Sequence, residues 1–414
     1  MSGFTYRRGE LCAEDVPLSA VAARFGTPCY VYSRAMLEGN WREFDEALTL
    51  PHLICYALKA NSNLAVLNLF ARLGSGFDIV SGGELARVIA AGGDPAKVVF
   101  SGVGKTDEEM HAALSARIRC FNVESQGELE RLSAIASSLS LRAPVSLRVN
   151  PDVDAGTHPY ISTGLKEDKF GVDAASALSL YRRAAEDKAL QIVGIDMHLG
   201  SQITDIGPYR EAVRRLLALV DALHDAGITL EHVDVGGGLG IRYRDEAQIA
   251  LDAYAALLAE LFRGRNETVL LEPGRRLVGD AGVLLTRVQY LKTGGARDFA
   301  IVDAAMNDLL RPALYDAWHP VHAVRQRHGG ARRWQIVGPV CESADFLARD
   351  RDLALEPDDL IAIGAAGAYA MSMSSNYNTR PRAAEVIVDG STAHLVRRRE
   401  SVEELFATES TLPE

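Results

Sequence analysis

The sequence predicts a (β/α)8 barrel followed by a smaller, β-rich domain. Between about residues 50 and 272, short apolar runs alternate with segments of helical length and pattern, as in a parallel sheet with helical crossovers. Beyond about residue 280, alternating apolar and polar runs are separated by glycine pairs, which is typical of antiparallel strands. A length of 414 residues suits one large and one smaller domain. We therefore predict a barrel over 27–280 and an antiparallel β-sandwich or barrel domain made of 1–26 and 281–414.

The barrel is predicted from a regular succession of strands. The expected strands are 52–59, 76–80, 97–101, 119–123, 144–150, 192–198, 231–236 and 268–272. The expected helices between them include 64–73, 83–91, 107–116, 126–139 and 208–226. Eight strands with helix-length connections are the number that closes this barrel. The gap after the fifth strand holds a polar insertion, 152–170, whose glycines and polarity suit a mobile lid.

The second domain is predicted from shorter alternating runs. Its expected strands are 283–291, 299–303, 333–337, 360–363 and 385–388. The segment up to about residue 26 contains a short helical pattern, and we expect it to pack in this domain.

Composition limits the class of protein. Hydrophobic residues make up 48% and charged residues 24% of the chain, which is typical of a globular protein with a sizeable core. The net charge of −11 argues against nucleic acid and anionic membrane as partners, since both favour basic surfaces. Neither a signal peptide nor a membrane-spanning run is apparent. The sequence favours a cytoplasmic protein.

The cysteines do not form a recognisable framework. They are odd in number, scattered and without CxxC spacing: Cys12, Cys29, Cys55, Cys120 and Cys341. A disulfide scaffold and a structural zinc site are therefore not expected, and no metal is predicted. Buried free thiols are the expected state of all but Cys341.

Polar residues or glycines follow every expected barrel strand, at the end where barrel enzymes keep their chemistry. In chain order they are Lys59, Asp78 with Ser81, Ser101, Asn122 with Glu124, Asn150, His198, Gly236 to Gly238, and Glu272. Each alone could be a helix cap or a turn residue. Their recurrence after eight strands favours an active site at this end of the barrel.

Lys59 ends the apolar run of the first strand. Partial desolvation of an ammonium favours the neutral amine, which is the nucleophile that a Schiff base requires. The alternative, for this residue taken alone, is a lysine that snorkels from a strand end. The polar residues after the other strands favour the catalytic interpretation.

Three further motifs follow the last three strands. Gly236-Gly237-Gly238 could bring backbone amides close to a phosphate, although a tight turn explains such a run about as well. It is not GxGxxG, so no nicotinamide cofactor is indicated. A buried Glu272 would need a cation, such as a protonated pyridine nitrogen. His198 could stack on a flat cofactor, and Ser201 nearby could bind a phosphate.

These motifs resemble the fold-type III pyridoxal-phosphate decarboxylases and, among them, the bacterial diaminopimelate decarboxylases. The likeness covers nearly the whole chain in matching order, with no departure at a position that the family uses. It rests on Tyr56–Asn61, His198–Ser201, Gly236–Gly238, Glu272–Arg275, Leu310–Tyr315, Cys341–Ser343, Gly367–Tyr369 and Ser375–Pro381.

The resemblance implies pyridoxal 5'-phosphate as the cofactor. Lys59 would hold it as a Schiff base, Glu272 would keep its ring nitrogen protonated, and His198 would stack on the ring. The remaining residues implied to contact it are Asp78, Ser201, Gly236, Gly237, Gly238, Pro273, Gly274, Arg275 and Tyr369.

The resemblance also implies a proton donor and an assembly. Cys341 would protonate the substrate carbon after CO2 leaves. Cys341 and Glu342 would act in the active site of a partner subunit, so a homodimer is implied. Tyr369 would touch both cofactor and substrate.

Charge favours a substrate with amino-acid groups at both ends. A distal carboxylate suits arginine, and Arg275, Arg311 and Tyr315 would bind it, while Glu342 would bind the distal ammonium. A substrate without that carboxylate would leave buried arginines unmatched. The family decarboxylates meso-diaminopimelate at its D centre and yields L-lysine. Arg311 could otherwise be a surface arginine before a proline turn.

Alternative functions can be distinguished by specific residues. A related decarboxylase acting on D-ornithine, D-lysine or carboxynorspermidine is the nearest alternative, and Arg311, Tyr315 and 376–381 favour diaminopimelate over it. An alanine-racemase-type enzyme would carry an arginine in place of Glu272. A non-catalytic regulator would have lost Lys59 or Cys341, and both are present.

Overall fold

A computed structural model describes residues 3–154, 169–327 and 329–414. The expected lid at 152–170 therefore lies mostly outside the described residues. The chain divides into two compact units: a barrel unit of 40–242 and 246–276, and a second unit of 1–39, 243–245 and 277–414.

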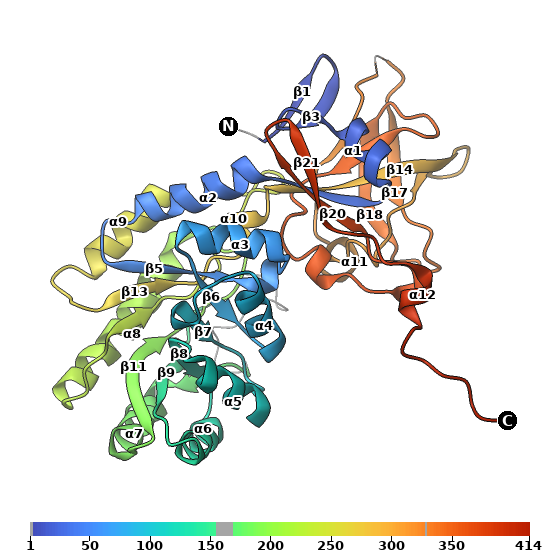
Figure 1. The fold of residues 1–414 in the computed structure, drawn as a ribbon. Coiled ribbons are helices and arrows are strands. Elements are labelled where there is room, and N and C mark those ends of the chain that lie inside the picture. The colour runs from blue at the N-terminus through green and yellow to red at the C-terminus, as the bar shows by residue number, and fades with distance from the viewer. Residues whose placement is uncertain (1–2, 155–168, 328) are drawn as a thin grey trace. The chain divides into compact units, whose positions relative to one another are not determined.

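The barrel unit is built on one closed sheet of parallel strands (Figure 1). Its order is β5-β6-β7-β8-β9-β11-β12-β13, and β13 pairs with β5 to close the ring. The strands are β5 His52–Ala57, β6 Gly76–Ile79, β7 Val98–Phe100, β8 Cys120–Val123, β9 Ala143–Asn150, β11 Leu190–Asp196, β12 His232–Asp234 and β13 Thr268–Leu271. A two-residue strand, β10 Val172–Asp173, adds to β9. The predicted (β/α)8 barrel is confirmed.

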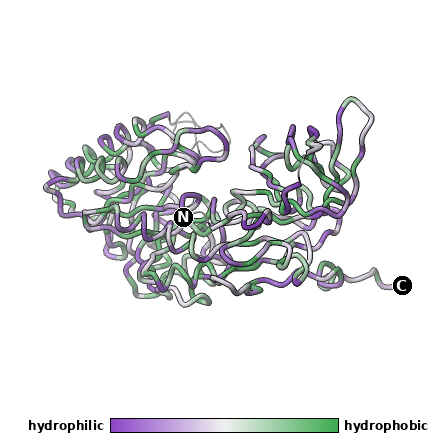
Figure 2. The backbone as a smooth tube through the Cα atoms, turned by 90° about the horizontal axis from the view of Figure 1, so that it is seen from above, coloured by the Kyte–Doolittle hydropathy of each residue, from purple (hydrophilic) through white to green (hydrophobic). Residues whose placement is uncertain are grey.

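Helices surround this sheet, and most of them begin after a residue whose side chain caps the first turn. They are α2 Arg34–Ala47, α3 Leu64–Leu73, α4 Gly82–Ala90, α5 Asp107–Ala116, α6 Gln126–Ser138, α7 Ala174–Glu186, α8 Ile206–Asp225 and α9 Leu251–Leu261, with single turns η1 Leu58–Ala60 and η2 Pro95–Lys97. Asn63, Ser81, Thr106 and Ser125 accept hydrogen bonds from the first free amides of α3 to α6. Hydrophilic and hydrophobic segments alternate along the backbone (Figure 2), as amphipathic helices with one buried face require.

Small and apolar side chains pack together in the barrel unit. Cys55, Val99, Cys120, Val193 and Leu270 form one buried cluster there. The strand pair β11–β12 sets Gly194 opposite His232, and a Cβ at Gly194 would lie 2.1 Å from the imidazole Nε2. Glycine at this position makes room for a fully buried ring.

The second unit contains a mixed sheet in the order β18-β17-β15-β14-β4-β20-β21, with β19 pairing both β14 and β16. The strands are β4 Cys29–Ser33, β14 Gly282–Lys292, β15 Asp298–Val302, β16 Val321–Ala323, β17 Arg332–Val337, β18 Phe346–Leu353, β19 Leu360–Ile363, β20 Ala384–Asp389 and β21 Thr392–Arg397. The predicted purely antiparallel pattern needs correction, because β15–β17 and β20–β4 are parallel. Both parallel pairs join strands that are not consecutive in the chain, so no hairpin dictates their direction.

The N-terminal segment packs in this second unit, as expected. It forms a small sheet of β1 Phe4–Arg7, β2 Glu10–Ala13 and β3 Val16–Pro17, followed by α1 Leu18–Phe25. One core cluster joins Leu18 and Val21 of α1 to Val31, Val283 and Val386 of the mixed sheet.

Short elements complete the second unit: α10 Arg275–Val278, which starts in the barrel unit, α11 Arg311–Tyr315, η4 Met371–Met373, η5 Tyr377–Thr379 and α12 Val402–Leu405. Among the described helices, none combines the length and the apolar character that crossing a bilayer requires.

Candidate active site

Lys59 lies just beyond β5, on the single turn η1, rather than in the strand predicted over 52–59. Its Nζ is 2.9 Å from Oδ2 of Asp78, near the end of the neighbouring strand β6. The lysine side chain is 36% exposed and the aspartate side chain is fully buried. The ammonium is therefore oriented by a buried carboxylate and remains reachable by a ligand.

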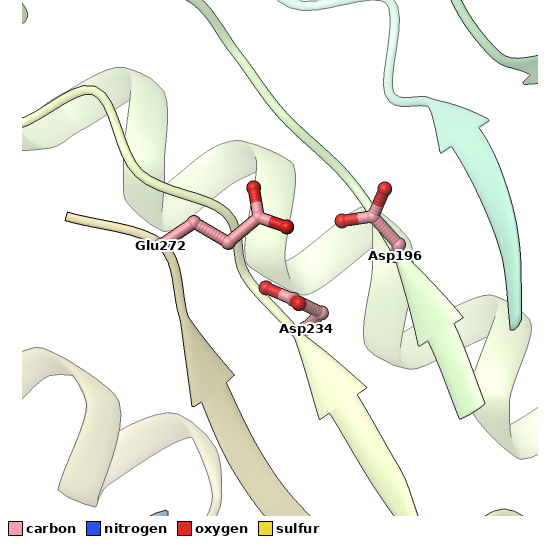
Figure 3. A group of neighbouring side chains, drawn as sticks. All are labelled: Asp196, Asp234 and Glu272. Carbon is pink, nitrogen blue, oxygen red and sulfur yellow. The ribbon is translucent and has the colours of Figure 1, made fainter. Parts of the chain in front are cut away.

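Three carboxylates meet where β11, β12 and β13 end (Figure 3). Asp196 and Asp234 are the last residues of β11 and β12, and Glu272 directly follows β13. One oxygen of each lies within 4.8 Å of the others, and all three residues are buried. Adjacent parallel strands explain the convergence, since their ends share one rim of the barrel.

Burial and mutual repulsion favour protonated carboxyls in this cluster. Burial, followed by the neighbouring Asp234, raises the pKa of Glu272 and of Asp196 well above the ordinary range. Burial raises the pKa of Asp234 to about 7, although Oδ1 accepts a hydrogen bond from the Gly236 amide. A cation beside Glu272 would favour its charged form. The cluster therefore suits a positively charged group.

Glu272 also accepts hydrogen bonds from two neutral side chains. Its Oε1 is 3.4 Å from both Ser101 Oγ and Asn122 Nδ2, and Asn122 also donates to Ser101 Oγ at 3.1 Å. Both residues come from the strand ends that the sequence singled out. They orient the Glu272 side chain through contacts that carry no charge of their own.

His198 follows β11 and is held as a neutral ring. Its Nδ1 accepts a hydrogen bond from the Gly237 amide at 3.2 Å. Burial, with Arg148 and Lys59 nearby, lowers the pKa of His198 well below its ordinary value. Nδ1 also lies 3.9 Å from Oε2 of Glu272. A neutral imidazole beside Glu272 fits the predicted stacking surface for a flat cofactor.

Steric constraints at positions 236–238 explain the glycine run there, in addition to its predicted role in binding phosphate. A Cβ at Gly237 would lie 2.0 Å from the Glu272 carbonyl oxygen. Gly238 has φ of +96°, and a Cβ there would lie 2.3 Å from the Gly200 carbonyl oxygen. Close packing of three strand ends therefore requires these glycines. Phosphate binding by their amides stays a prediction.

Ser201 and Arg275 are brought together, because the Arg275 Nη2 donates to Ser201 Oγ at 3.0 Å. Gly274 packs against the lysine turn, where a Cβ would lie 3.0 Å from that of Ala60. Pro273 also contributes, since its carbonyl accepts a hydrogen bond from the Ala57 amide at 3.2 Å. The segment after β13 thus links the Lys59 turn to Ser201.

The remaining predicted residues belong to the second unit. Cys341 is exposed, whereas the other four cysteines are buried. Its amide donates to Asn378 Oδ1 at 3.4 Å, and Tyr377 Oη donates to Glu342 Oε1 at 2.5 Å. Tyr369 adopts a positive φ of 53°. Cys341 and Glu342 are therefore both held by the segment 376–378, which carries part of the family motif.

Arg311 and Tyr315 are the first and last residues of α11. The Arg311 side chain is not at the surface, since the residue is only 7% exposed. Its Nη1 donates to His319 Nε2 at 2.8 Å, and its guanidinium lies 4.5 Å from the centre of the Tyr243 ring. The alternative of a surface arginine before a proline turn is therefore wrong.

The barrel residues fit pyridoxal phosphate on their chemistry. A reachable lysine would hold an aldehyde, a buried carboxylate would face a protonated ring nitrogen, and a neutral imidazole would face a flat ring. The Ser201 hydroxyl, Arg275 and the Gly238 amide suit a phosphate, whereas the Gly236 and Gly237 amides donate to Asp234 and His198. Three buried carboxyl oxygens have no hydrogen-bond partner among the described residues: Oδ1 of Asp78, Oδ1 of Asp196 and Oδ2 of Asp234. Such oxygens favour a cationic ligand.

Sequence reasoning missed Asp196 and His319 and gave Asp234 no role. Asp196 is the last residue of β11 and lies two positions before His198, which the sequence did single out. Asp196 and Asp234 each interrupt an apolar run near its end, and such an interruption could have identified them. His319 follows a short helix in an irregular segment, where no periodicity indicates its direction.

Comparison with known proteins agrees with this chemistry. Residues 34–279 match the family described as pyridoxal-dependent decarboxylase, pyridoxal binding domain. A Pseudomonas aeruginosa protein named diaminopimelate decarboxylase is 61% identical over 415 residues, with 100% of each chain covered.

Solved structures agree as well. Diaminopimelate decarboxylase from Helicobacter pylori, complexed with L-lysine, has a TM-score of 0.92 and 42% identity, covering 95% of this chain and 99% of that one. Diaminopimelate decarboxylase from M. jannaschii, also in complex with L-lysine, has a TM-score of 0.95 and 37% identity, covering 100% of this chain and 99% of that one. The chain therefore belongs to the pyridoxal-dependent decarboxylases and, among them, to the diaminopimelate decarboxylases.

Proposed function

We propose that the chain decarboxylates meso-2,6-diaminopimelate at its D centre, with pyridoxal 5'-phosphate as cofactor, and releases L-lysine and CO2. The observation that carries this proposal is the full-length 61% identity to a protein named for that activity. The lysine and the buried carboxylate at the rim of the barrel supply the chemistry that the reaction needs. The reaction would form lysine from its immediate precursor.

Bound pyridoxal phosphate supplies a conjugated ring that accepts the electron pair released as CO2 leaves. Lys59 would hold the cofactor covalently until substrate displaces it. Glu272, kept anionic by the ring's positive charge, would keep the ring nitrogen protonated. His198 would stack on the face of the ring, and Ser201, Arg275 and the amides of Gly238 and Gly274 would bind the phosphate.

The second unit would supply the substrate contacts and the proton. Arg311 and Tyr315 would bind the carboxylate at the L centre, and Glu342 would bind its ammonium. Cys341 would donate a proton to the carbon that lost CO2, which its exposure permits. Its amide contact with Asn378 would orient the backbone that carries the thiol.

We further propose a cytoplasmic homodimer in which Cys341 and Glu342 serve the partner's active site. A mixing experiment tests the shared site. Lys59→Ala and Cys341→Ala chains, each strongly impaired alone, should regain part of the activity after mixing and subunit exchange, because one hybrid site would carry both residues. No recovery by a demonstrably mixed dimer would contradict sharing. Cell fractionation would test the location.

An absorbance spectrum followed by a product assay tests the reaction. We expect a visible band from lysine-bound cofactor, and both CO2 and L-lysine after addition of meso-diaminopimelate. A band without L-lysine formation would shift the substrate to D-ornithine, D-lysine or carboxynorspermidine. No band after adding pyridoxal phosphate would contradict the enzyme itself.

A further inference from the structure

We propose that His319 is a positioning residue that holds Arg311 in place for the substrate carboxylate at the L centre and so helps to select substrates that carry it. The inference rests on the proposed function and adds to it a residue that does not itself touch substrate. It is carried by the hydrogen bonds on the two sides of one buried imidazole.

The two ring nitrogens of His319 have different partners. Nδ1 is 2.9 Å from the Gly364 carbonyl oxygen, and Nε2 is 2.8 Å from Arg311 Nη1. A carbonyl can only accept and a guanidinium can only donate. Nδ1 therefore carries the proton, Nε2 presents its lone pair to the arginine, and the imidazole is neutral.

The backbone fixes this imidazole firmly. His319 is fully buried and lies two residues before β16, while Gly364 directly follows β19. These strands pair antiparallel, with Val321 opposite Ile363, and the Gly364 amide donates to the Pro320 carbonyl at 2.8 Å. The hydrogen-bond acceptor for Arg311 is thus set by a strand pair rather than by a flexible loop.

The Tyr243 ring packs against both Arg311 and His319. It lies 4.5 Å from the Arg311 guanidinium and 5.3 Å from the His319 ring, at 76° to that ring. An aromatic face attracts a cation without neutralising it. Tyr243 and His319 together therefore fix the plane of the guanidinium through neutral contacts.

Neutrality of these contacts matters for binding. A carboxylate at the position of His319 would offset the arginine's charge, and a protonated imidazole would lose its acceptor and repel the guanidinium. A neutral acceptor uses one N–H and does not itself offset the positive charge. The guanidinium is planar with its donors in a rigid fork, so fixing one N–H also orients those that would bind a carboxylate.

Two ligands that differ by this single carboxylate provide the test. L-lysine, the expected product, keeps the carboxylate of the L centre, and cadaverine is the same diamine without it. Their inhibition constants against CO2 release from meso-diaminopimelate would be measured for the cofactor-loaded enzyme. The ratio of the two constants reports recognition of the carboxylate separately from binding of the amines.

His319→Asn is the diagnostic variant. The asparagine amide can still donate to Gly364, as Nδ1 does, but it is too short to reach Arg311. We expect the inhibition constant of L-lysine and the KM of meso-diaminopimelate to rise about tenfold, since hydrogen bonds to charged groups are worth this much. The cadaverine constant and kcat should change less than about twofold.

His319→Gln is the matched rescue variant, because its longer side chain can place an oxygen near the position of Nε2. It should restore most of the L-lysine affinity. His394→Asn, at an exposed histidine of the same unit, should leave both constants unchanged. Thermal unfolding and the visible absorbance of bound cofactor would show that each variant is folded and loaded.

A double-mutant cycle with Arg311→Gln tests whether His319 affects L-lysine binding through Arg311. Once the guanidinium is gone, His319→Asn should have little further effect on L-lysine. Equal loss of L-lysine and cadaverine affinity, no loss of either, failure of glutamine to rescue, or an unchanged effect without Arg311 would overturn the proposal.

Failure of the proposed reaction gives a different result. Wild-type protein would then form no L-lysine from meso-diaminopimelate. The L-lysine and cadaverine affinities could still be compared by titrating the cofactor absorbance, so the role of His319 would be tested on its own. If His319→Asn does not fold, the glutamine variant and the Arg311→Gln variant still measure the carboxylate preference.

Discussion

The two units of the molecule carry their candidate residues on different kinds of structure. In the barrel unit, Asp196, Asp234 and Glu272 lie at or directly after the ends of adjacent parallel strands. In the second unit, Arg311 lies in a five-residue helix and Cys341 in an irregular segment. A barrel brings strand ends together whatever lies in its loops, whereas each position in the second unit depends on its own local contacts.

The electrostatic settings differ as well. The barrel cluster consists of buried like charges whose pKa values are raised. The Arg311 site shows a cation beside a neutral histidine and an aromatic ring. The first setting favours a cationic ligand and the second an anionic one. Substitutions in the barrel should therefore alter the cofactor, and those in the second unit should alter substrate handling.

The largest expected effect tests the barrel. Lys59→Ala should lower kcat by about 10³-fold or more and remove the visible band of lysine-bound cofactor, because the chain would lose its covalent attachment to the cofactor. Spectra and CO2 release would measure both. Lys188→Ala, at an exposed lysine of the same unit, is the control. Substantial turnover by Lys59→Ala would contradict the proposed role of Lys59 in holding the cofactor.

Glu272→Gln should have the next largest effect. A neutral amide cannot hold the ring nitrogen protonated, so we expect kcat to fall by about 10²–10³-fold, the size found when an electrostatic contact to the reacting system is removed. Cofactor should still bind through the lysine, and the visible band should remain. The exposed Glu186→Gln is the matched control. Unchanged kcat would show that the cluster does not act on the ring.

Cys341→Ala should distinguish the role of the second unit in proton donation from the role of the barrel unit in cofactor binding. We expect retained cofactor absorbance and unchanged thermal stability, but kcat lower by about 10²-fold, since a positioned acid contributes at least this much. Cys341→Ser would keep a weak donor and should be intermediate. Stopped-flow absorbance and L-lysine formation would measure the slow step. Full turnover by the alanine variant would assign the proton to another group.

The sequence predicted the barrel well because its rules are local and repeated. The helix 107–116 was predicted to the residue, and β6, β7 and β8 differ by one residue at their ends. Apolar runs of period two and capped helices each depend on a few neighbouring residues. The site at the strand ends followed from the same rules, since the order of strands fixes which ends are adjacent.

The misses have physical reasons too. Lys59 lies in η1 because the chain turns after Ala57, where the Pro273 carbonyl accepts the last ladder hydrogen bond. The parallel pairs β15–β17 and β20–β4 join distant parts of the chain, and alternation of residues does not reveal strand direction. His319 was missed because its importance comes from two partners, Gly364 and Arg311, which a linear pattern does not bring together.

The smallest expected effect concerns stability rather than catalysis. The raised pKa of Asp234, about 7, means that the folded protein without cofactor holds a proton that the unfolded chain releases near pH 4. Stability should therefore fall as pH rises from about 4 to about 7, by at most about 1.4 kcal/mol per pH unit from this residue, and then level off. Asp234→Asn removes that titration and should flatten the fall.

Urea unfolding of cofactor-free wild type, Asp234→Asn and the exposed Asp225→Asn at several pH values would measure this slope. Only the first substitution should reduce it. Glu272 and Asp196 would keep part of the slope, because burial raises the pKa of each in the same direction. Cofactor should also reduce it in wild type, since a cation beside Glu272 would favour the ionised cluster. An identical slope in all three proteins would mean that Asp234 does not hold this proton in the folded chain, and the electrostatic contrast with the Arg311 site would then rest on Glu272 and Asp196 alone.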